Sequence, residues 1–402
     1  MTTTINNEHK KLNVPNLRFP EFKGEWKKCI LGDITENFNL RNKDKIQYPM
    51  FSVTNDRGFV PQSEQFEGRD MVGEDIKAYK IIHTNDFAYN PARINVGSIA
   101  MYTGEKPCMI SSLYVCFKTT KEVNNEWLMQ LLKTPKMNYY YNVNGEGGVR
   151  VYLFYPNFAR IRMSIPKLEE QKKIAKLLNL IDERIATQNK IIEDLKKLKS
   201  AIIENVFDDK HSERLQLDNV GSYIRGLTYS SNDVVEHGGT LVMRSNNIVN
   251  GSLLDYNNNV VFVNKKMSAE QQLQNGDIVI CMANGSSSLV GKSSFYDGNC
   301  HSPITVGAFC GIYRSKEPIV KWLFQTNKYR RYIWNSLQGG NGAIANLNGE
   351  DILNMSFSIP NAPIKDTCVK MLTSVDSALE NNMSLCALYT LQKQHLLRQM
   401  FI

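Results

Sequence analysis

Two stretches of this sequence, Met163-Ser164-Ile165-Pro166 and Phe357-Ser358-Ile359-Pro360, stand 194 positions apart and introduce the same pattern. Without a gap, the register that they define runs on to Val206-Phe207, which align with Met400-Phe401. Self-similarity at a fixed offset is typical of a duplicated structural unit. We therefore expect two related halves, each with a variable globular part followed by one long segment that both halves share.

The shared segment has the periodicity of a long helix. From Ile174, alternating steps of four and three residues reach Val206, and eight of the ten positions are apolar. This spacing is typical of a coiled-coil seam, and Pro166 and Pro360 suit the two helix starts. Adding 194 to each position gives an equivalent seam in the second half. We expect the helices to pair through Ile174, Leu178, Ile181, Ile185, Ile192, Leu195, Leu372, Val375, Leu379, Tyr389 and Leu396.

The alternative is that each helix packs only on its own domain, as most amphipathic helices do. A helix of about 39 residues spans roughly 58 Å at 1.5 Å per residue, which is more than a small domain needs. The length therefore favours a helix that extends between two bodies and acts as a spacer.

The globular parts are expected to be mixed α/β (α+β). Short β-type runs divided by Gly, Asn and Pro turns occur at 50–53, 113–117, 276–280 and 306–309. Shorter helices are expected at 126–133 and 320–336. The predicted domains are two similar globular domains and two long helices, with boundaries at 1–166, 167–210, 211–360 and 361–402.

Composition limits the classes of protein. With 402 residues, 42% of them hydrophobic, the chain can form two to three domains of roughly 150 residues. Its net charge of +8 is compatible with nucleic acid, although a somewhat basic protein without such a partner has the same charge. No 18-residue apolar run or signal peptide is found, which predicts a cytoplasmic protein with no membrane partner. The eight cysteines form no C-x-x-C pair, which argues against structural zinc.

No motif of a DNA-modifying enzyme is complete in this sequence. Gly291-Lys292-Ser293 ends like a P-loop, but Ser286 stands where that motif needs glycine. Asn90-Pro91-Ala92-Arg93 begins like the Asn-Pro-Pro-aromatic motif of amino-methyltransferases, yet the second proline and the aromatic residue are missing. The six histidines have no metal-binding spacing. We expect a non-catalytic chain with no cofactor or metal of its own.

The chain resembles the specificity subunit of type I restriction-modification enzymes over nearly its whole length. Two features carry the likeness: residues 17–34, with Leu17-Arg18-Phe19-Pro20-Glu21-Phe22, Trp26 and Leu31-Gly32-Asp33-Ile34, and residues 165–182, which begin Ile165-Pro166-Lys167-Leu168-Glu169-Glu170-Gln171 and end Ile181-Asp182. The second copy departs from the pattern, since Lys365-Asp366 replace Gln171-Lys172 and Cys368 replaces Ile174.

The resemblance implies a division of labour. Two target recognition domains would each read one half of a split, asymmetric DNA sequence, while the two helices pair as an antiparallel coiled coil of fixed length. Two methylation subunits would dock on the helices and supply S-adenosylmethionine, and restriction subunits would add chemistry that depends on ATP and Mg²⁺. This chain would select the target site on double-stranded DNA.

Candidate base contacts are polar residues in loops, because arginine binds guanine through two hydrogen bonds and asparagine binds adenine in the same way. Asn and Ser clusters also form ordinary turns, which is the alternative at each position. The candidates are Asn55, Arg57, Asn90, Arg93, Arg244, Asn246, Asn247, Asn284, Ser286 and Lys292. Two other functions stay open: a coiled-coil scaffold that reads no DNA, and a restriction or methyltransferase polypeptide with an unrecognised active site.

Overall fold

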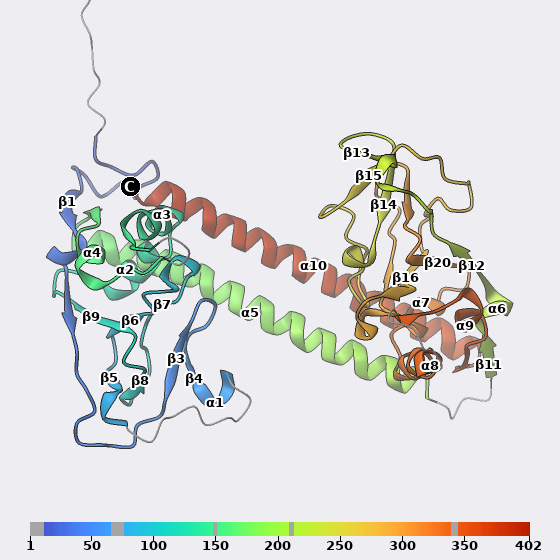
Figure 1. Cartoon of the computed structure of the whole chain (residues 1–402), viewed down its shortest axis with the longest axis horizontal. Coiled ribbons are helices and arrows are strands. Elements are labelled where there is room, and N and C mark those ends of the chain that lie inside the picture. Colours follow the sequence, from blue (N-terminus) through green and yellow to red (C-terminus); the bar gives the residue numbers. More distant parts are fainter. Residues whose placement is uncertain (1–11, 66–75, 148–150, 209–212, 339–344) are drawn as a thin grey trace, which may run out of the picture. The chain divides into compact units, whose positions relative to one another are not determined.

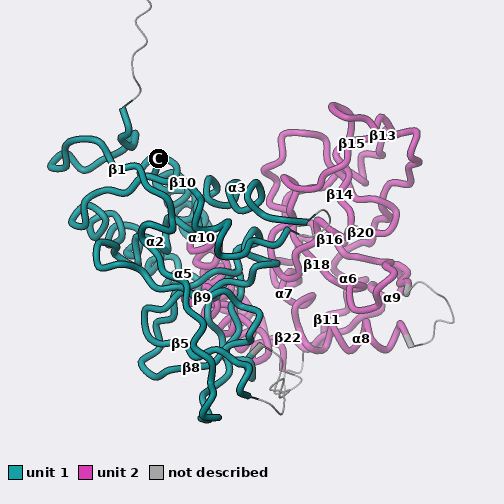
Figure 2. Tube along the Cα trace, turned by 60° about the vertical axis from the view of Figure 1, so that its left-hand side comes forward, with its two compact units in different colours: residues 1–189, 384–402 teal, residues 190–383 magenta. Residues whose placement is uncertain are grey.

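The computed structural model describes residues 12–65, 76–147, 151–208, 213–338 and 345–402. The chain forms two compact units, which Figure 2 distinguishes by colour. The first unit comprises residues 1–189 and 384–402, and the second comprises residues 190–383. Each unit thus combines one globular part with segments of both long helices. None of the described helices is both long enough and apolar enough to cross a membrane.

The first unit contains ten strands and four short helices among its described residues. The strands are β1 (Lys27–Ile30), β2 (Thr35–Phe38), β3 (Phe51–Thr54), β4 (Gly58–Pro61), β5 (Lys80–Ile82), β6 (Phe87–Tyr89), β7 (Ile99–Met101), β8 (Cys108–Ile110), β9 (Val115–Thr119) and β10 (Arg162–Ile165). The helices are α1 (Gln62–Gln65), α2 (Asn125–Leu132), α3 (Pro135–Asn144) and α4 (Tyr155–Ala159). Its central antiparallel sheet has the order β2-β9-β6-β7, beside the pairs β3-β4, β5-β8 and β1-β10.

The second unit contains twelve strands and four short helices among its described residues. The strands are β11 (Glu213–Gln216), β12 (Gly221–Arg225), β13 (Val234–Val235), β14 (Thr240–Met243), β15 (Val261–Val263), β16 (Ile278–Cys281), β17 (Ala283–Asn284), β18 (Ser293–Phe295), β19 (Ile304–Val306), β20 (Cys310–Ser315), β21 (Ala345–Asn346) and β22 (Ser356–Ile359). The helices are α6 (Leu217–Val220), α7 (Val320–Leu323), α8 (Asn327–Gln338) and α9 (Gly349–Leu353). Two four-stranded sheets, β12-β20-β16-β18 and β13-β15-β14-β19, form its body.

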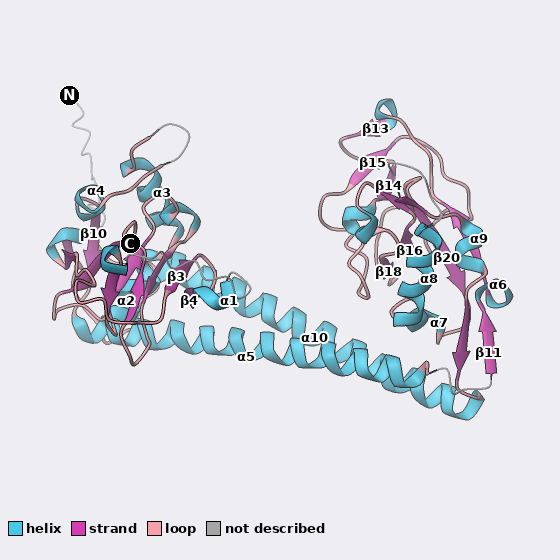
Figure 3. Ribbon diagram, turned by 60° about the horizontal axis from the view of Figure 1, so that its bottom comes forward, coloured by secondary structure: helices cyan, strands magenta, loops and turns pink. Residues whose placement is uncertain are grey.

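The two units share one topology. The order β2-β9-β6-β7 in the first unit corresponds to β12-β20-β16-β18 in the second. The register corresponds as well, since Lys27 faces Ile165 at one end of β1-β10 and Glu213 faces Ile359 at the same end of β11-β22. Figure 3 shows strands and short helices grouped beside the long helices in each unit. The structure therefore confirms the duplicated mixed α/β fold that the 194-residue repeat predicts.

Matching helix caps explain where the short helices begin. The Thr134 hydroxyl accepts the N–H of Met137 at the start of α3, and Thr326 accepts the N–H of Tyr329 at the start of α8. Such caps satisfy backbone donors that have no partner in the first helical turn. The Thr326 cap also corrects the expected helix at 320–336, because the chain forms α7, turns, and begins again as α8.

Two long helices, α5 (Leu168–Val206) and α10 (Ala362–Met400), have 39 residues each and begin and end at equivalent repeat positions. Figure 1 shows them running along one another. The expected seam residues Ile174, Leu178, Ile181, Leu372 and Leu379 are buried. The other expected seam residues are half-buried: Ile185, Ile192, Leu195, Val375, Tyr389 and Leu396.

Each globular core includes residues of both long helices. In the first unit, Leu178 of α5 and Met400 of α10 belong to the cluster around Trp127 and Phe158. In the second unit, Ile203 of α5 and Leu372 of α10 belong to the cluster around Trp322. Helix packing on a domain and helix pairing are therefore both present, because one apolar stripe serves both.

Two ion pairs join the helices and show that they run antiparallel. In the first unit Asp182 binds Lys393 at 2.6 Å, and in the second unit Lys199 binds Asp376 at 2.7 Å. The repeat relates the pairs, because adding 194 to Asp182 gives Asp376 and subtracting 194 from Lys393 gives Lys199. The two copies of the repeat thus form the same lysine–aspartate bridge twice.

Other boundaries differ locally from the expected ones. The run 113–117 was expected to be strand, but β9 begins only at Val115. The run 306–309 was also expected to be strand, but β19 ends at Val306 and a turn follows. In both places β-type side chains occupy a turn, because residue type alone does not show where inter-strand pairing stops.

Candidate nucleic-acid interface

In the first unit, three strands end at the same edge. The bridge between Met50 and Met109 is parallel, so the ends of β3 and β8 lie together. Strand β6 pairs antiparallel with β9, with Tyr89 opposite Val115, so the end of β6 adjoins the start of β9. Three loops therefore converge there: residues 54–58, residues 90–97 and residues 111–114. We call them the first strand-end surface.

A hydrogen bond and a close approach show that the first two of these loops, residues 54–58 and 90–97, lie against each other. The Ser98 hydroxyl donates to the carbonyl of Val53 at 2.7 Å. A Cβ built on Gly97, whose φ is +99°, would lie 3.4 Å from the Cβ of Asn55. Arg93 is the residue before the 3-10 turn that Gly97 ends, so the structure brings the loops of Asn55 and Arg93 together.

The expected contact residues of this surface differ in their exposure and in their existing hydrogen bonds and ion pairs. Asn55, Arg57 and Arg93 are exposed. Arg57 lies 4.0 Å from the exposed Glu64 carboxylate, a weak surface pair that DNA phosphate could replace. Asn90 is half-buried and its side-chain oxygen accepts the N–H of Ala92, which closes a local turn. Asn90 thus also stabilises the local turn.

The second unit repeats this arrangement. Strands β14 and β19 are parallel, with Met243 beside Val306, so residues 244–247 and 307–310 meet. Cys281 of β16 lies opposite Cys310 of β20, which adds residues 283–286 to the same edge. Lys292 also lies at this edge, because the next residue, Ser293, pairs with Ile280. We call residues 244–247, 283–286 and 307–310 the second strand-end surface.

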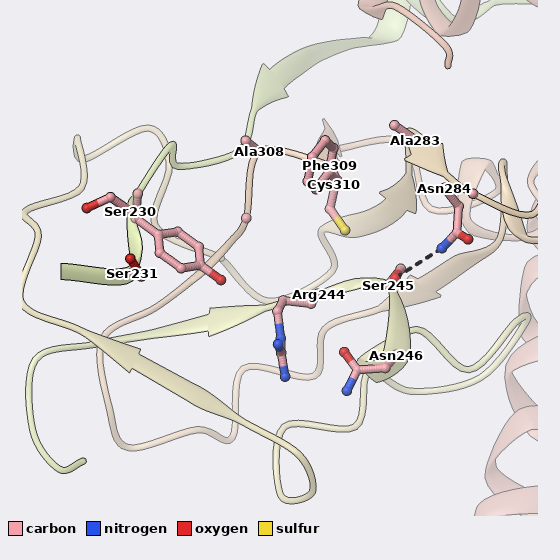
Figure 4. A pocket seen from close by; sticks show the side chains of 13 residues that line it. Ser230, Ser231, Arg244, Ser245, Asn246, Ala283, Asn284, Ala308, Phe309 and Cys310 are labelled. Carbon is pink, nitrogen blue, oxygen red and sulfur yellow. Dashed lines mark hydrogen bonds between the residues drawn. The ribbon is translucent and has the colours of Figure 1, made fainter. Parts of the chain in front are cut away.

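A pocket of about 520 Å³ opens on the second strand-end surface. Arg244, Asn246 and Asn284 line it, together with Tyr229 and Phe309, which the sequence analysis did not select. Figure 4 shows these lining residues coming from separate segments, and it marks the hydrogen bond from the Asn284 amide to the Ser245 hydroxyl at 3.3 Å. Hydrogen-bonding groups beside aromatic rings are suited to base edges.

Among the expected residues of the second surface, Asn247 is the exception. It is 1% exposed, its side-chain oxygen accepts the N–H of Arg244, and its amide donates to the carbonyls of Asp255 and Asn258. These bonds hold the loop and leave no group for DNA, so we drop Asn247 from the candidates. Exposed Ser286 donates its backbone N–H to Asn284, which fixes the turn between them.

The two buried cysteines at this edge, Cys310 and Cys281, are not activated nucleophiles. Burial raises the pKa of the Cys310 thiol to about 12, and burial also raises the pKa of Cys281. Both side chains therefore stay protonated near neutral pH, whereas catalytic cysteines act as thiolates. Within the described parts of the chain, no group of three or more His, Cys, Asp or Glu residues is placed to hold a metal ion.

Comparison with known proteins gives the surfaces a context. Residues 23–197 match the type I restriction modification DNA specificity domain. This match covers less than half of the chain, including most of the first globular part and of α5. The chain is 26% identical over 209 residues to the putative MjaX specificity subunit of Methanocaldococcus jannaschii, covering 50% of this chain and 49% of that one. It is 35% identical over 155 residues to the EcoKI specificity subunit of Escherichia coli, covering 36% and 31%.

The matches to curated relatives thus span a third to a half of their length. The chain also matches the crystal structure of the type I S subunit from M. genitalium, with a TM-score of 0.61 and 13% identity over 97% of this chain and 99% of that one. At this identity the match concerns the fold, and it covers both units.

Proposed function

We propose that this chain is the DNA-specificity subunit of a type I restriction-modification system and that it reads a bipartite, asymmetric target. One observation carries the proposal: two units of the same topology present equivalent surfaces with different side chains. Arg93 follows β6 in the first unit, where Asn284 follows β16 in the second. Because arginine suits guanine and asparagine suits adenine, the two surfaces suit different half-sites.

Charge on the surfaces supports contact with duplex DNA. Arg57 and Arg93 lie on the first surface, and Arg244 and Lys292 lie at the second. Such groups reach phosphate oxygens as well as base edges, and phosphate contacts set register and affinity. The residues proposed to contact DNA are Asn55, Arg57, Asn90, Arg93, Arg244, Asn246, Asn284, Ser286 and Lys292.

The long helices supply the second half of the proposal. Each of α5 and α10 contributes to both units, and 39 residues extend about 58 Å at 1.5 Å per residue. We propose that they fix the number of unread base pairs between the half-sites, as protein geometry sets half-site spacing elsewhere. The segments 167–210 and 361–402 would then be spacers, and 1–166 and 211–360 target recognition domains.

The partners follow from this proposal. Two methylation subunits would dock on the helical region and bring S-adenosylmethionine, and restriction subunits would bring ATP- and Mg²⁺-dependent cleavage. The chain itself would act in the cytoplasm as a non-catalytic subunit that selects the site.

Methylome sequencing tests the proposal. A host expressing the chain with its methylation subunit should acquire methylation at one split, asymmetric motif that is missing when this chain is left out. An unchanged methylome, with the complex shown to assemble, would refute the reading function and favour a scaffold.

Matched variants assign each half-site. Arg93→Ala should relax only one half, and Arg244→Ala only the other. Arg160→Ala and Lys316→Ala are the controls, because both residues are exposed and adjoin the opposite end of each central sheet. Relaxation of the motif in a control would contradict the assignment of the strand-end surfaces.

A further inference from the structure

The same turn exposes a large apolar side chain in both units. Leu113 is 76% exposed and Phe309 is 68% exposed. Each is the third residue of a tight turn between a short buried strand and the central strand of its sheet: Ser111–Tyr114 between β8 and β9, and Gly307–Cys310 between β19 and β20. The positions are equivalent, because Thr119 ends β9 six residues after Leu113 and Ser315 ends β20 six residues after Phe309.

Both turns are held rigidly. The Tyr114 N–H donates to the carbonyl of Ser111, and the Cys310 N–H donates to that of Gly307 at 2.8 Å. The carbonyl of Phe309 accepts the N–H groups of Met282 and Ala283. In the first unit, Tyr114 is fixed by hydrogen bonds to Val53 and Lys80. The backbone is therefore tied to the core while one apolar side chain points outward.

A single exposed apolar residue on a protein surface is ordinary. Here exposure recurs at one equivalent position of two copies whose neighbouring residues differ. The shared property is apolarity without a hydrogen-bonding group, since one side chain is aliphatic and the other aromatic. A group that favours contact with either the leucine or the phenylalanine side chain is therefore itself apolar.

We infer that Leu113 and Phe309 each contact the C5-methyl group of a thymine, one in each half-site, and so determine specificity at one A·T pair. This inference rests on the proposed DNA-reading function. Thymine presents the only methyl group in the major groove of unmodified DNA, and apolar side chains recognise it by contact. The surrounding polar groups of each strand-end surface, such as Arg93 and Asn284, would read the neighbouring edges by hydrogen bonds.

Uracil substitution tests the proposed methyl contact, because uracil differs from thymine only in lacking the C5-methyl group. The complex of the full chain with its methylation subunit is assayed on duplexes carrying its target, with each thymine of the half-sites replaced in turn by uracil. For the unaltered chain, one uracil in each half-site should slow methylation by about fourfold, the factor expected for burial of one methyl-sized group.

The variants then locate the contact. Phe309→Ala should make the complex insensitive to uracil in one half-site only, and Leu113→Ala in the other half-site only. Tyr139→Ala and Trp334→Ala are the controls, because each of these side chains is 64% exposed and lies on a helix. Both controls should keep the uracil sensitivity of the unaltered chain.

Several results would overturn the inference. The first is that uracil and Phe309→Ala lower the methylation rate additively, and the second is that one variant changes the uracil sensitivity of both half-sites. The inference would also be wrong if a half-site has no A·T pair, or if the variants no longer bind the methylation subunit. An unaltered complex that modifies no split target would instead refute the proposed function itself.

Discussion

Replacing Asp376 by asparagine should destabilise the protein far more than replacing its repeat equivalent, Asp182. The Asp376 carboxylate accepts Lys199 at 2.7 Å, Lys321 at 2.8 Å and the indole N–H of Trp322 at 3.1 Å. The side chains of Lys199 and Asp376 are only 8% and 7% exposed. Burial lowers the pKa of Lys199, while the Asp376 carboxylate opposes that shift.

The magnitude follows from burial. Asp376→Asn removes the carboxylate from the buried Lys199 ammonium, which keeps its hydrogen bond to the carbonyl of Gly251 at 3.0 Å. Breaking a buried pair costs about 3–5 kcal/mol. In the first unit the Lys393 and Asp182 side chains are 20% and 41% exposed, so Asp182→Asn should cost about 1 kcal/mol or less. For a unit of this size, the difference corresponds to a drop in Tm on the order of 10 °C.

Thermal unfolding of the full chain, followed by circular dichroism, measures both variants beside the unaltered protein. Asp182→Asn is the matched control, because the repeat places it in the same bridge. Equal and small shifts for the two variants would refute the argument that burial, rather than the ion pair itself, sets the cost.

Two further predictions concern the helices and the thiols. Removing one heptad from each helix, residues 185–191 and 379–385, keeps the four-three seam and shortens each helix by about 10.5 Å. Methylome sequencing should then find a gap between the half-sites that is about three base pairs shorter, with slower methylation because the half-sites are also rotated about the DNA axis. An unchanged gap would contradict the spacer role of the helices. Burial raises the pKa of Cys108, Cys116 and Cys310 to about 12, so these thiols should resist alkylation at pH 8, and rapid alkylation of the folded chain would count against their burial. Because the unfolded thiols ionise first, each should lower the free energy of unfolding by about 1.4 kcal/mol per pH unit above pH 9, until its folded pKa is reached.

The helices could be predicted from the sequence because their signal is repeated. The offset of 194 residues fixed the relation between Leu168 and Ala362 and between Val206 and Met400, where the two helices begin and end. Helical periodicity is local, so a single sequence contains it. Strand order is not local, and nothing in the sequence revealed that β9 would lie between β2 and β6.

The candidate site was only partly predictable for the same reason. Arg93 and Asn284 could be selected by residue type, but Asn247 looked equally suitable and turned out to be buried. Leu113 and Phe309 were assigned to strands because their types favour strands, and their exposure depends on where strand pairing stops. Exposure at a turn is set by tertiary contacts that residue type does not encode.

Completion of the first unit has a consequence for synthesis of the protein. Its core includes Met400, and the N–H of Leu17 donates to the carbonyl of Gln399, yet residues 190–383 are made in between. At 5–20 residues per second, a ribosome needs about 10–40 s for that stretch. During this time the first globular part exposes the apolar surface that α10 later covers. A nascent chain in this state is a natural client for a chaperone, and the domain translated first is the one whose folding finishes last.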